Sequence, residues 1–424
     1  MIARGETGVP GDKSVTHRAL LLGALAAGPC RFTRPLASLD TRATAAALRA
    51  LGVKVGPLVE GRAVVVRGLG LRPPPFHAPR GALHCRNSGT TARLLLGLLA
   101  AHPFEARLTG DRSLRRRPMA RVTEPLRAMG AAIEASEGER LPLVVRGGPL
   151  VPLAWRSPVA SAQVKTALLL AGVAGGVRVA VTEPVASRDH TERLLRLLGV
   201  RVEVQDTTTA VEPPETLPAF EGEIPGDISS AAYLVAAGLL ATSGELVVHG
   251  VGVNPTRTGF LRAVARMGGK VEESGRFFSL GEAAASLVAR PARLKAIEVA
   301  PEEIPSMVDE IPLLACLAAR AEGRSVFRGV GELRVKESDR LALVAANLAA
   351  LGVAAHTEGD TLMVEGTDAP PAGRVTTAGD HRLAMAFAVL GTVPGAAVEL
   401  DDRGCVAVSY PGFFRDLARV LHAS

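Results

Sequence analysis

Basic and hydroxyl side chains gather at the start of an apolar run near the beginning of the chain. The stretch "GDKSVTHRALLLGALAAG" (11–28) places Lys13, Ser14 and Arg18 where a helix is expected to begin, in a chain with only six lysines. A helix N-terminus already has unpaired N–H groups and a partial positive charge, so additional cations are unfavourable there. They become favourable when an anion binds among them. The spacing therefore predicts an anion-binding site.

Five further clusters of polar residues precede apolar runs in the same way. They are "CRNSGTTAR" (85–93), "VASAQVKT" (159–166), "PGDISSAA" (225–232), "PSMVDEIP" (305–312) and "AGDHRLA" (378–384). Helix capping explains part of the pattern, because Ser, Thr, Asp and Asn are the usual N-cap residues. It does not explain the basic residues Arg93, Lys165 and Arg382. Since the chain has only three asparagines and two glutamines, the presence of Asn87 and Gln163 in these clusters also favours binding over capping.

Two further charged segments fit one interdomain cleft, toward which we expect all six helix N-termini to point. "GDRSLRRRPM" (110–119) places four arginines in one loop, and "GELRVKESDRLA" (331–342) alternates basic and acidic residues ahead of a helix. Taken alone, the first segment fits a solvated run of charges equally well, and the second fits an ordinary exposed, salt-bridged helix start. Together with the helix starts, they favour a small acidic substrate.

A short Ala/Leu-rich run recurs six times along the chain, at intervals of roughly 70 residues. The copies span 18–28, 92–101, 166–176, 231–244, 311–323 and 382–391. Each copy is apolar on nearly all sides, which predicts a buried helix. A more amphipathic run follows each copy, and five of these end in Leu-Gly or Met-Gly, where glycine takes the left-handed conformation beyond a helix C-terminus. We therefore predict an α/β fold of two similar domains with three repeats each, separated near the proline-rich stretch 211–220.

The composition is typical of a globular protein with a small acidic ligand. The net charge is +7, but the 49 basic residues are spread along the chain, and aromatic residues make up only 3%. A nucleic-acid-binding protein would gather its charge on one face and use aromatic residues for base stacking. The apolar runs are well short of the ~20 residues of a membrane span. We therefore expect neither a nucleic acid nor a membrane as partner.

The cysteines and the N-terminal stretch indicate the compartment. Cys30, Cys85, Cys316 and Cys405 form neither a C-x-x-C pair nor a disulfide framework. The N-terminal stretch lacks the apolar core of a signal peptide, so we expect a cytoplasmic protein. His190 has no second His or Cys at ligand spacing, which favours an orienting role over metal binding. We expect no metal and no cofactor.

Eight stretches of the sequence, taken together, resemble one enzyme family, 3-phosphoshikimate 1-carboxyvinyltransferase (EPSP synthase). They are "GDKSVTHR", "NSGTTAR", "LRRRPM", "SAQVKTALL", "SRDHTE", "MVDEIP", "RVKESDR" and "GDHRLAMA", in the order of the family, and they span the whole chain. "NSGTTAR", "SRDHTE" and "MVDEIP" resemble the bacterial branch outside the enteric group. Some members of the family carry a lysine at the position where this chain has Val408. The valine agrees with the branch outside the enteric group, and it cannot take the role of that lysine.

The resemblance implies a fold as well as a function. It implies two domains, each of three βαβαββ repeats, in the inverted α/β barrel of the enolpyruvyl transferases. Residues 13–222 would form one domain, and residues 1–12 with 223–424 the other, so that the chain crosses between them near residues 12 and 222. We expect the protein to act as a monomer that closes on its substrates.

The resemblance also implies a reaction by addition and elimination. Shikimate 3-phosphate is joined through its 5-hydroxyl to C2 of phosphoenolpyruvate while C3 is protonated, and the tetrahedral intermediate then loses phosphate. This chemistry needs a base near the hydroxyl and an acid near C3. Asp309 matches the family residue that contacts the hydroxyl and is the expected base. Glu337 and Lys13 are the candidates for the second proton relay.

The family match further assigns two sets of binding residues, and Lys13 is expected to lie between both substrates. The residues matched to shikimate 3-phosphate are Lys13, Ser14, Arg18, Ser161, Ala162 through its backbone, Gln163, Arg188, Asp309 and Lys336. Those matched to phosphoenolpyruvate are Lys13, Asn87, Gly89, Arg117, Gln163, Arg340 and Arg382. Arginine suits such positions because its planar fork binds carboxylate and phosphate through two parallel hydrogen bonds.

Two other functions involve anionic substrates of related chemistry. The enolpyruvyl transferase that acts on a UDP-sugar has the same fold but usually carries a cysteine in the loop that corresponds to "RSLRRRPM", where this chain has none. A phosphate-binding kinase could use "GVPGDKS" as a P-loop, but Asp12 stands where the second glycine is required. Both alternatives are therefore less consistent with the sequence than the shikimate enzyme.

Overall fold

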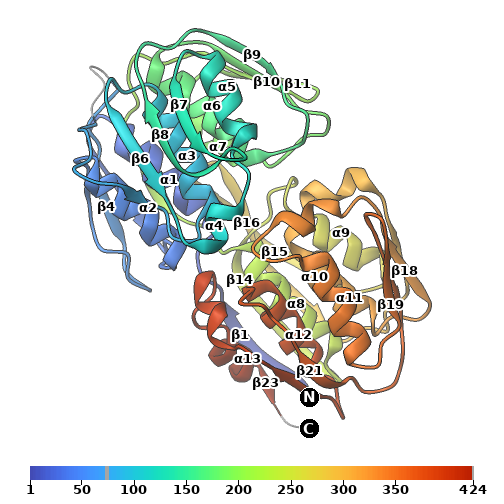
Figure 1. Cartoon of the computed structure of the whole chain (residues 1–424). Helices are drawn as coiled ribbons and strands as arrows, with labels where there is room; N and C mark the ends of the chain where they lie inside the picture. Colours follow the sequence, from blue (N-terminus) through green and yellow to red (C-terminus); the bar gives the residue numbers. More distant parts are fainter. Residues whose placement is uncertain (72–75, 423–424) are drawn as a thin grey trace. The chain divides into compact units, whose positions relative to one another are not determined.

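The computed structural model describes residues 1–71 and 76–422 (Figure 1). The chain divides into two compact units, which we call the N-terminal unit and the C-terminal unit. The N-terminal unit contains Gly11–Ile224 and Ser279–Glu282, and the C-terminal unit contains Met1–Pro10, Pro225–Phe278 and Ala283–Ser424. The first strand, blue in Figure 1, therefore folds with the second half of the chain, although the two are far apart in the sequence.

Three repeats of strand, helix, strand, helix and hairpin make up the N-terminal unit. The first contains β13 (Glu221–Glu223), α1 (Lys13–Leu25), β2 (Pro29–Thr33), α2 (Leu39–Ala50), β3 (Lys54–Val55) and β4 (Val64–Arg67). The second contains β5 (Leu83–His84), α3 (Gly89–Ala100), β6 (Glu105–Thr109), α4 (Arg112–Arg116), α5 (Ala120–Ala128), β7 (Ala132–Ser136) and β8 (Arg140–Arg146). The third contains β9 (Leu153–Arg156), α6 (Ala162–Gly175), β10 (Val179–Thr182), α7 (His190–Leu197), β11 (Val202–Gln205) and β12 (Thr208–Val211).

The C-terminal unit repeats this order of elements, except that its last repeat ends in one strand where the expected βαβαββ unit has a hairpin. Its first repeat contains β1 (Ile2–Gly8), α8 (Ile228–Leu240), β14 (Ser243–Gly252), α9 (Gly259–Arg266), β15 (Lys270–Ser279) and β16 (Glu282–Arg290). The second contains β17 (Glu298–Val299), the 3-10 helices η1 (Pro301–Ser306) and η2 (Val308–Glu310), α10 (Ile311–Ala318), β18 (Arg324–Phe327), η3 (Gly331–Val335), α11 (Arg340–Ala350), β19 (Ala355–Glu358) and β20 (Thr361–Glu365). The third contains β21 (Ala372–Val375), α12 (His381–Leu390), β22 (Ala397–Leu400), η4 (Gly404–Val408), α13 (Phe413–Val420) and β23 (Leu421–His422).

The strand order shows that the repeats are equivalent. The strand before the first helix pairs in parallel with the strand after it, as in β5 with β6, β9 with β10 and β17 with β18. The hairpin then adds two antiparallel strands, and four sheets have the same order, first, second, fourth and third. The sheet that contains β1 has the same order and one additional strand. This strand is β23, the last of the chain, and it pairs antiparallel with β1. The predicted α/β fold class is confirmed.

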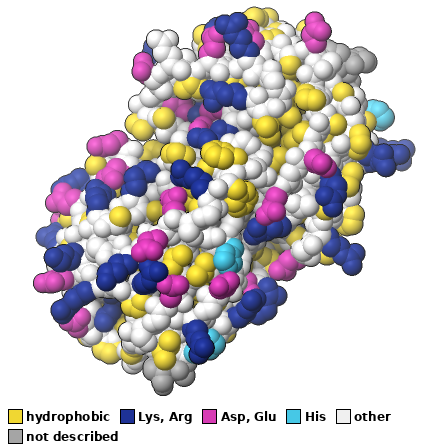
Figure 2. Space-filling model, turned by 180° about the vertical axis from the view of Figure 1, so that it is seen from behind, with side chains coloured by type: hydrophobic (Ala, Val, Ile, Leu, Met, Phe, Trp, Pro, Cys, Tyr) yellow, Lys and Arg dark blue, Asp and Glu magenta, His cyan; other side chains and the backbone are white. Residues whose placement is uncertain are grey.

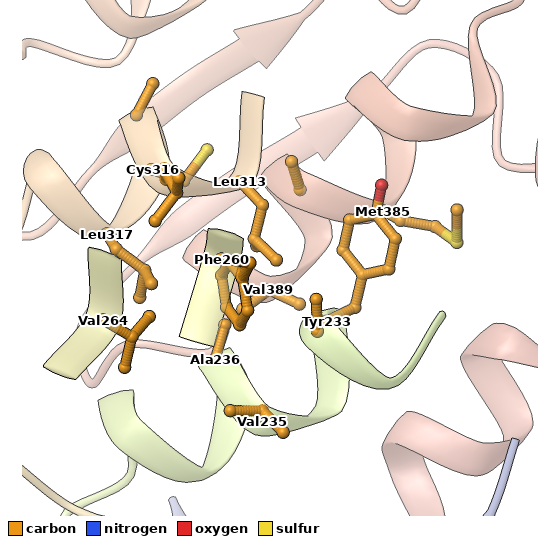
Figure 3. Packing of buried hydrophobic residues seen from close by; sticks show 14 of the residues in the cluster. Tyr233, Val235, Ala236, Phe260, Val264, Leu313, Cys316, Leu317, Met385 and Val389 are labelled. Carbon is orange, nitrogen blue, oxygen red and sulfur yellow. The ribbon is translucent and has the colours of Figure 1, made fainter. Parts of the chain in front are cut away.

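The first helix of each repeat lies in the core of its unit, as predicted. In the N-terminal unit, α3 and α6 approach so closely that a Cβ on Gly97 would lie 2.0 Å from the carbonyl oxygen of Ala167, so only glycine fits there. Figure 3 shows the corresponding helices of the C-terminal unit, where Tyr233 of α8, Leu313 of α10 and Met385 of α12 lie in one apolar cluster. The sides of these helices are therefore unavailable to a ligand, whereas Lys13 and Ser14 at the start of α1 are only half-buried.

Charges of both signs are mixed on the surface. Figure 2 shows Lys and Arg side chains interspersed with Asp and Glu over the face in view. Some arginines are neutralised twice, as Arg146 is by Glu105 and Glu134. This distribution differs from the continuous basic stripe of a nucleic-acid-binding face. Within 1–71 and 76–422, no helix is both long enough and apolar enough to cross a membrane.

Candidate active site

Acidic and hydroxyl side chains cap the N-termini of buried helices. The sequence analysis predicted such caps as part of the explanation for the polar clusters. Asp12 accepts a hydrogen bond from the Val15 N–H at the start of α1, and Ser88 accepts one from the Thr91 N–H at the start of α3. The same role falls to Ser161 before α6, Asp227 before α8 and Asp380 before α12. Capping therefore explains one residue in five of the six clusters, since α10 has no described side-chain cap, and the neighbouring basic residues need another explanation.

The start of α1 holds two basic side chains in different environments. Lys13 has 19% of its side chain exposed, and its Nζ lies 3.2 Å from Oδ2 of Asp40. Arg18 is buried, and it donates hydrogen bonds of 2.7 Å to the hydroxyls of Thr191 and Thr166. Burial lowers the pKa of Arg18 to about 10, although Glu192 and Asp12 oppose the shift, so this side chain stays charged at neutral pH. α6 and α7 thus fix the guanidinium of Arg18 beside the start of α1.

The start of α3 brings together five residues that the sequence analysis singled out. Arg117, at the end of α4, donates a hydrogen bond of 3.0 Å from Nη2 to Oδ1 of Asn87. Arg93 donates one of 2.6 Å from Nη1 to Oε1 of Gln163, which lies in the first turn of α6. A Cβ on Gly89 would lie 2.9 Å from Nη1 of Arg93 and 3.2 Å from Nη1 of Arg117. A glycine at the helix start therefore leaves room for two guanidinium groups.

The start of α6 is closed on one side by a buried ion pair. The backbone N–H of Ser161 donates to Oε1 of Glu183 at 2.8 Å, and Ala162 at the first helical position is half-buried. Lys165, which the sequence analysis grouped with the ligand-facing cations, is buried instead, with Nζ 2.9 Å from Glu183 and 2.8 Å from Glu192. That expectation was wrong, because Lys165 balances two internal carboxylates. Arg188, half-buried before α7, is close enough to lower the pKa of Arg18.

In the C-terminal unit, three arginines surround Asp309. Its carboxylate lies 3.5 Å from Nη1 of Arg340, 3.8 Å from Nη2 of Arg382 and 4.0 Å from Nη1 of Arg257. The backbone oxygen of Asp309 also accepts a hydrogen bond of 3.3 Å from Arg382. The 3-10 turn η2 sets this carboxylate at the start of α10, with 15% of the side chain exposed. Asp309 is therefore both reachable and electrostatically stabilised as an anion.

Arg340 is the most enclosed member of this cluster. Its Nε donates to Oδ2 of Asp380 at 2.8 Å, and its Nη2 donates to Oδ1 of Asp380 at 3.2 Å and to Oε2 of Glu337 at 2.5 Å. Burial would lower the pKa of Arg340, but Asp380 and Glu337 outweigh it and raise this pKa. Lys336 lies next to this cluster in the chain, but its Nζ pairs with Glu332 at 3.1 Å.

Three residues near Asp309 were missed by the sequence analysis. Arg257 is buried and donates to the Ser229 hydroxyl at 2.8 Å, and Ser229 in turn donates to Oε1 of Glu310. Oε1 of Glu310 lies 3.9 Å from Arg257 and 3.6 Å from Arg382. Arg257 follows a strand without a preceding helix-start pattern, so no sequence signal marked it. Glu310 stands next to Asp309 in "MVDEIP", and this adjacency could have drawn attention to it.

Two side chains that could take part in chemistry, His190 and Cys85, lie in buried surroundings. His190 has its Nδ1 2.8 Å from Oε1 of Glu282, and both side chains are buried. This contact suits the orienting role expected from the sequence. Burial raises the pKa of the Cys85 thiol to about 12, so this thiol stays protonated and unreactive at neutral pH.

A buried chain of hydrogen bonds makes the N-terminal unit sensitive to acid. Nδ1 of His17 lies 2.8 Å from the Thr44 hydroxyl, which is 2.7 Å from that of Thr91. Burial, together with Lys13 and Arg18, holds the pKa of His17 well below its ordinary value of 6.5. The unfolded chain then binds the extra proton first as the pH falls below 6.5, so stability is present above that pH and is lost below it.

The variant His17→Gln is therefore expected to flatten the pH dependence of the melting temperature between pH 7 and pH 5, values that bracket the ordinary histidine pKa of about 6.5. Glutamine keeps a polar partner for Thr44 but does not titrate. Scanning calorimetry across this range measures the effect, and His249→Gln is the control because His249 is half-exposed. Equal slopes for the wild type and His17→Gln would contradict the prediction.

The sequence and fold were compared with those of known proteins. A family model described as EPSP synthase (3-phosphoshikimate 1-carboxyvinyltransferase) matches residues 3–417. The chain is 50% identical over 423 residues to the 3-phosphoshikimate 1-carboxyvinyltransferase of Thermus thermophilus, an alignment that covers 99% of this chain and 97% of that protein. It is 49% identical over 418 residues to the protein of that name from Gloeobacter violaceus, with 98% and 96% covered.

Solved structures show the same similarity. An EPSP synthase from Acinetobacter baumannii superposes with a TM-score of 0.88 at 36% identity, covering 99% of this chain and 96% of that one. The enolpyruvyl transferase NikO from Streptomyces tendae gives a TM-score of 0.78 at 19% identity, covering 99% of this chain and 95% of that one. At this lower identity the likeness concerns the fold alone.

Proposed function

The chain belongs to the EPSP synthase family, and from this premise we propose how its two groups of charged side chains carry out the family reaction. The enzyme transfers the enolpyruvyl group of phosphoenolpyruvate to the 5-hydroxyl of shikimate 3-phosphate and releases phosphate. The observation that carries the assignment of residues is the pair of anion-binding clusters, one around the helix starts of the N-terminal unit and one around Asp309. Both substrates are polyanions, so each needs several fixed cations.

We assign shikimate 3-phosphate mainly to the N-terminal unit. Arg18, Lys13 and Ser14 would hold the carboxylate and ring at the start of α1, where the hydrogen bonds to Thr166 and Thr191 fix the guanidinium. The phosphate would bind at the start of α6, on Ser161, the Ala162 N–H, Gln163 and Arg188. A helix N-terminus presents free N–H groups and a favourable dipole to such a phosphate. The family match also assigns Asp309 and Lys336 to this substrate.

We assign phosphoenolpyruvate to three arginines and the residues that the family match places with them. Arg117, with Asn87 and the Gly89 backbone, would bind one end, and Lys13 and Gln163 would contact the same substrate. Arg340 and Arg382 would bind the other end. The Asn87 contact and the carboxylates Asp309 and Asp380 hold these guanidinium groups in place before substrate arrives. Such preorganised cations also stabilise charge that develops on the departing phosphate.

Proton transfer needs two groups in this scheme. Asp309 would take the proton of the 5-hydroxyl, because three arginines keep it anionic while its side chain stays partly exposed. The ion pair of Glu337 with Arg340 favours the ionised form of Glu337. Glu337 can therefore donate a proton to C3 only after taking one up, whereas the ammonium group of Lys13 carries a proton from the start.

The test is an assay of phosphate release with purified protein, without nucleotide or added metal. Phosphate should be released from phosphoenolpyruvate only when shikimate 3-phosphate is present. Release that depends on a UDP-sugar would move the assignment to the cell-wall enolpyruvyl transferases, and a requirement for ATP would favour a kinase. Retention of DNA at physiological ionic strength would revive nucleic acid binding.

We expect Gly89→Ala to weaken glyphosate, the inhibitor of this family, more than phosphoenolpyruvate. The added Cβ would approach Nη1 of Arg93 to 2.9 Å and Nη1 of Arg117 to 3.2 Å, and it would occupy space beside the bound substrate. A ligand larger than phosphoenolpyruvate at this point loses more affinity. The ratio of the glyphosate inhibition constant to the KM for phosphoenolpyruvate should rise about tenfold, the effect of a contact worth ~1.4 kcal/mol. Equal losses for both ligands would refute this prediction.

We further propose that the protein works as a monomer in the cytoplasm. The four cysteines are free thiols, which suits a reducing compartment. Light scattering in the presence and absence of both substrates tests the monomer, and fractionation of cells tests the compartment.

A further inference from the structure

One buried carboxylate joins the two segments that contain the proposed phosphate contacts. Glu183 lies directly after β10, and 2% of its side chain is exposed. Its Oε1 accepts a hydrogen bond of 2.8 Å from the backbone N–H of Ser161. Its Oε2 accepts bonds of 3.3 Å from the N–H and 2.8 Å from the hydroxyl of Ser187. Glu183 therefore connects the start of α6 with the loop before α7.

A buried cation holds this carboxylate in its charged form. Nζ of Lys165 lies 2.9 Å from Oε2 of Glu183 and donates a hydrogen bond of 3.5 Å to the backbone oxygen of Ser187. The same ammonium group lies 2.8 Å from Glu192. A buried charge without a partner is strongly destabilising, so these three side chains depend on one another. The network is rigid because each member is buried and has more than one contact.

We propose that Glu183 is a positioning residue for the phosphate of shikimate 3-phosphate. The inference rests on the proposed function, which places that phosphate between Ser161 and Arg188. Ser161 donates its backbone N–H to Glu183, and Ser187 directly precedes Arg188 in the chain. Glu183 sets the distance between the two phosphate contacts without touching the substrate.

The chemistry of this position requires a carboxylate. Every group that faces Glu183 is a donor: two backbone N–H groups, one hydroxyl and one ammonium. An ionised carboxylate accepts from all of them, whereas a glutamine amide has one accepting and one donating end. In Glu183→Gln the NH2 group must face either the Ser161 N–H or the Ser187 N–H. One of the two segments then loses its attachment.

The test compares two ligands that differ only in the phosphate. Isothermal titration calorimetry gives Kd values for shikimate and for shikimate 3-phosphate, and the ratio of the first value to the second measures the contribution of the phosphate. In Glu183→Gln the ratio should fall about tenfold, the cost of one buried donor left unpaired. The KM for phosphoenolpyruvate should stay within about twofold of the wild type, since that substrate is assigned to other residues.

Glu192→Gln is the matched control. Glu192 is equally buried and pairs with the same lysine, but it does not contact Ser161 or Ser187 in any described hydrogen bond. Its charge acts on Arg18, which is assigned to the carboxylate and ring of both ligands. Glu192→Gln should therefore weaken shikimate and shikimate 3-phosphate equally and leave the ratio unchanged. A purely structural role for Glu183 predicts the same unchanged ratio for both variants.

Three further variants separate the possible failures. Ser187→Ala removes only the hydroxyl bond to Glu183, and a threefold fall of the ratio is expected for the loss of one side-chain hydrogen bond worth ~0.6 kcal/mol. It serves as the test if Glu183→Gln does not fold. Ser161→Ala and Arg188→Met test the assigned contacts directly. If these two lower the ratio while Glu183→Gln and Ser187→Ala do not, the positioning role is wrong. If none of the four changes it, the phosphate assignment itself is wrong, and the positioning role falls with it.

Discussion

Replacement of Asp309 by asparagine is expected to lower kcat about a thousandfold, within the range for loss of a general base. Asparagine has nearly the shape of aspartate, and its one oxygen can still accept from Arg340, while its NH2 group takes the place of the oxygen that faces Arg382. It cannot take the proton of the attacking hydroxyl. Because binding groups remain in place, the Kd of shikimate 3-phosphate should change far less than kcat. Phosphate release under saturating substrates and calorimetric binding measure the two quantities.

The neighbouring carboxylate offers a matched control for this variant. Glu310 lies next to Asp309 in the chain and approaches Arg257 and Arg382, but its side chain is 1% exposed. Glu310→Gln removes a negative charge from the same cluster without removing a group that substrate can reach. Its effect on kcat should be at least tenfold smaller than that of Asp309→Asn. Similar losses in both variants would mean that Asp309 acts through the charge of the cluster and is not the base.

The helix starts are the part of the site that the sequence could predict, and Lys165 shows where such a prediction ends. Cap residues and small residues are recognised by type, so the starts of α1, α3 and α6 follow from local pattern. The direction of a long side chain one turn later depends on what packs beside the helix. Arg18 and Lys165 both follow a capped start, yet Arg18 lies against hydroxyls and Lys165 against two carboxylates. Those partners come from α6, from α7 and from the residue after β10, which no local pattern connects to the helix start.

Long-range pairing limited the prediction in the same way. The repeats were visible because hydrophobic periodicity and terminal glycines are local features. The exchange of first strands between the two units was not visible in the sequence. It depends on the pairing of β1 with β14 and of β13 with β2, each across some two hundred residues. Only the resemblance to a family implied that crossing. Arg257 and Glu310 were missed for a related reason. Their contacts near Asp309 form only when α8, η2 and α12 lie together in the folded unit.

Arg340→Met is expected to cost about 3–5 kcal/mol of folding free energy, the range for breaking a buried ion pair. Arg340 and Asp380 have 1% and 0% of their side chains exposed, and two hydrogen bonds join them. Methionine fills the volume but leaves the charge of Asp380 buried without its main partner. Differential scanning calorimetry should show a lower melting temperature. The kcat/KM for phosphoenolpyruvate should also fall about a hundredfold or more, because a cation assigned to that substrate is lost.

A second substitution separates the two effects of Arg340. Asp380→Asn in the Arg340→Met background removes the uncompensated charge, and asparagine still caps α12, where Asp380 now accepts from the Arg382 N–H. The double variant should therefore regain at least half of the lost folding free energy. Its kcat/KM for phosphoenolpyruvate should stay as low as in Arg340→Met, since asparagine and methionine supply no cation. Recovery of activity together with stability would show that Arg340 acts only through the fold of the C-terminal unit and does not bind the substrate.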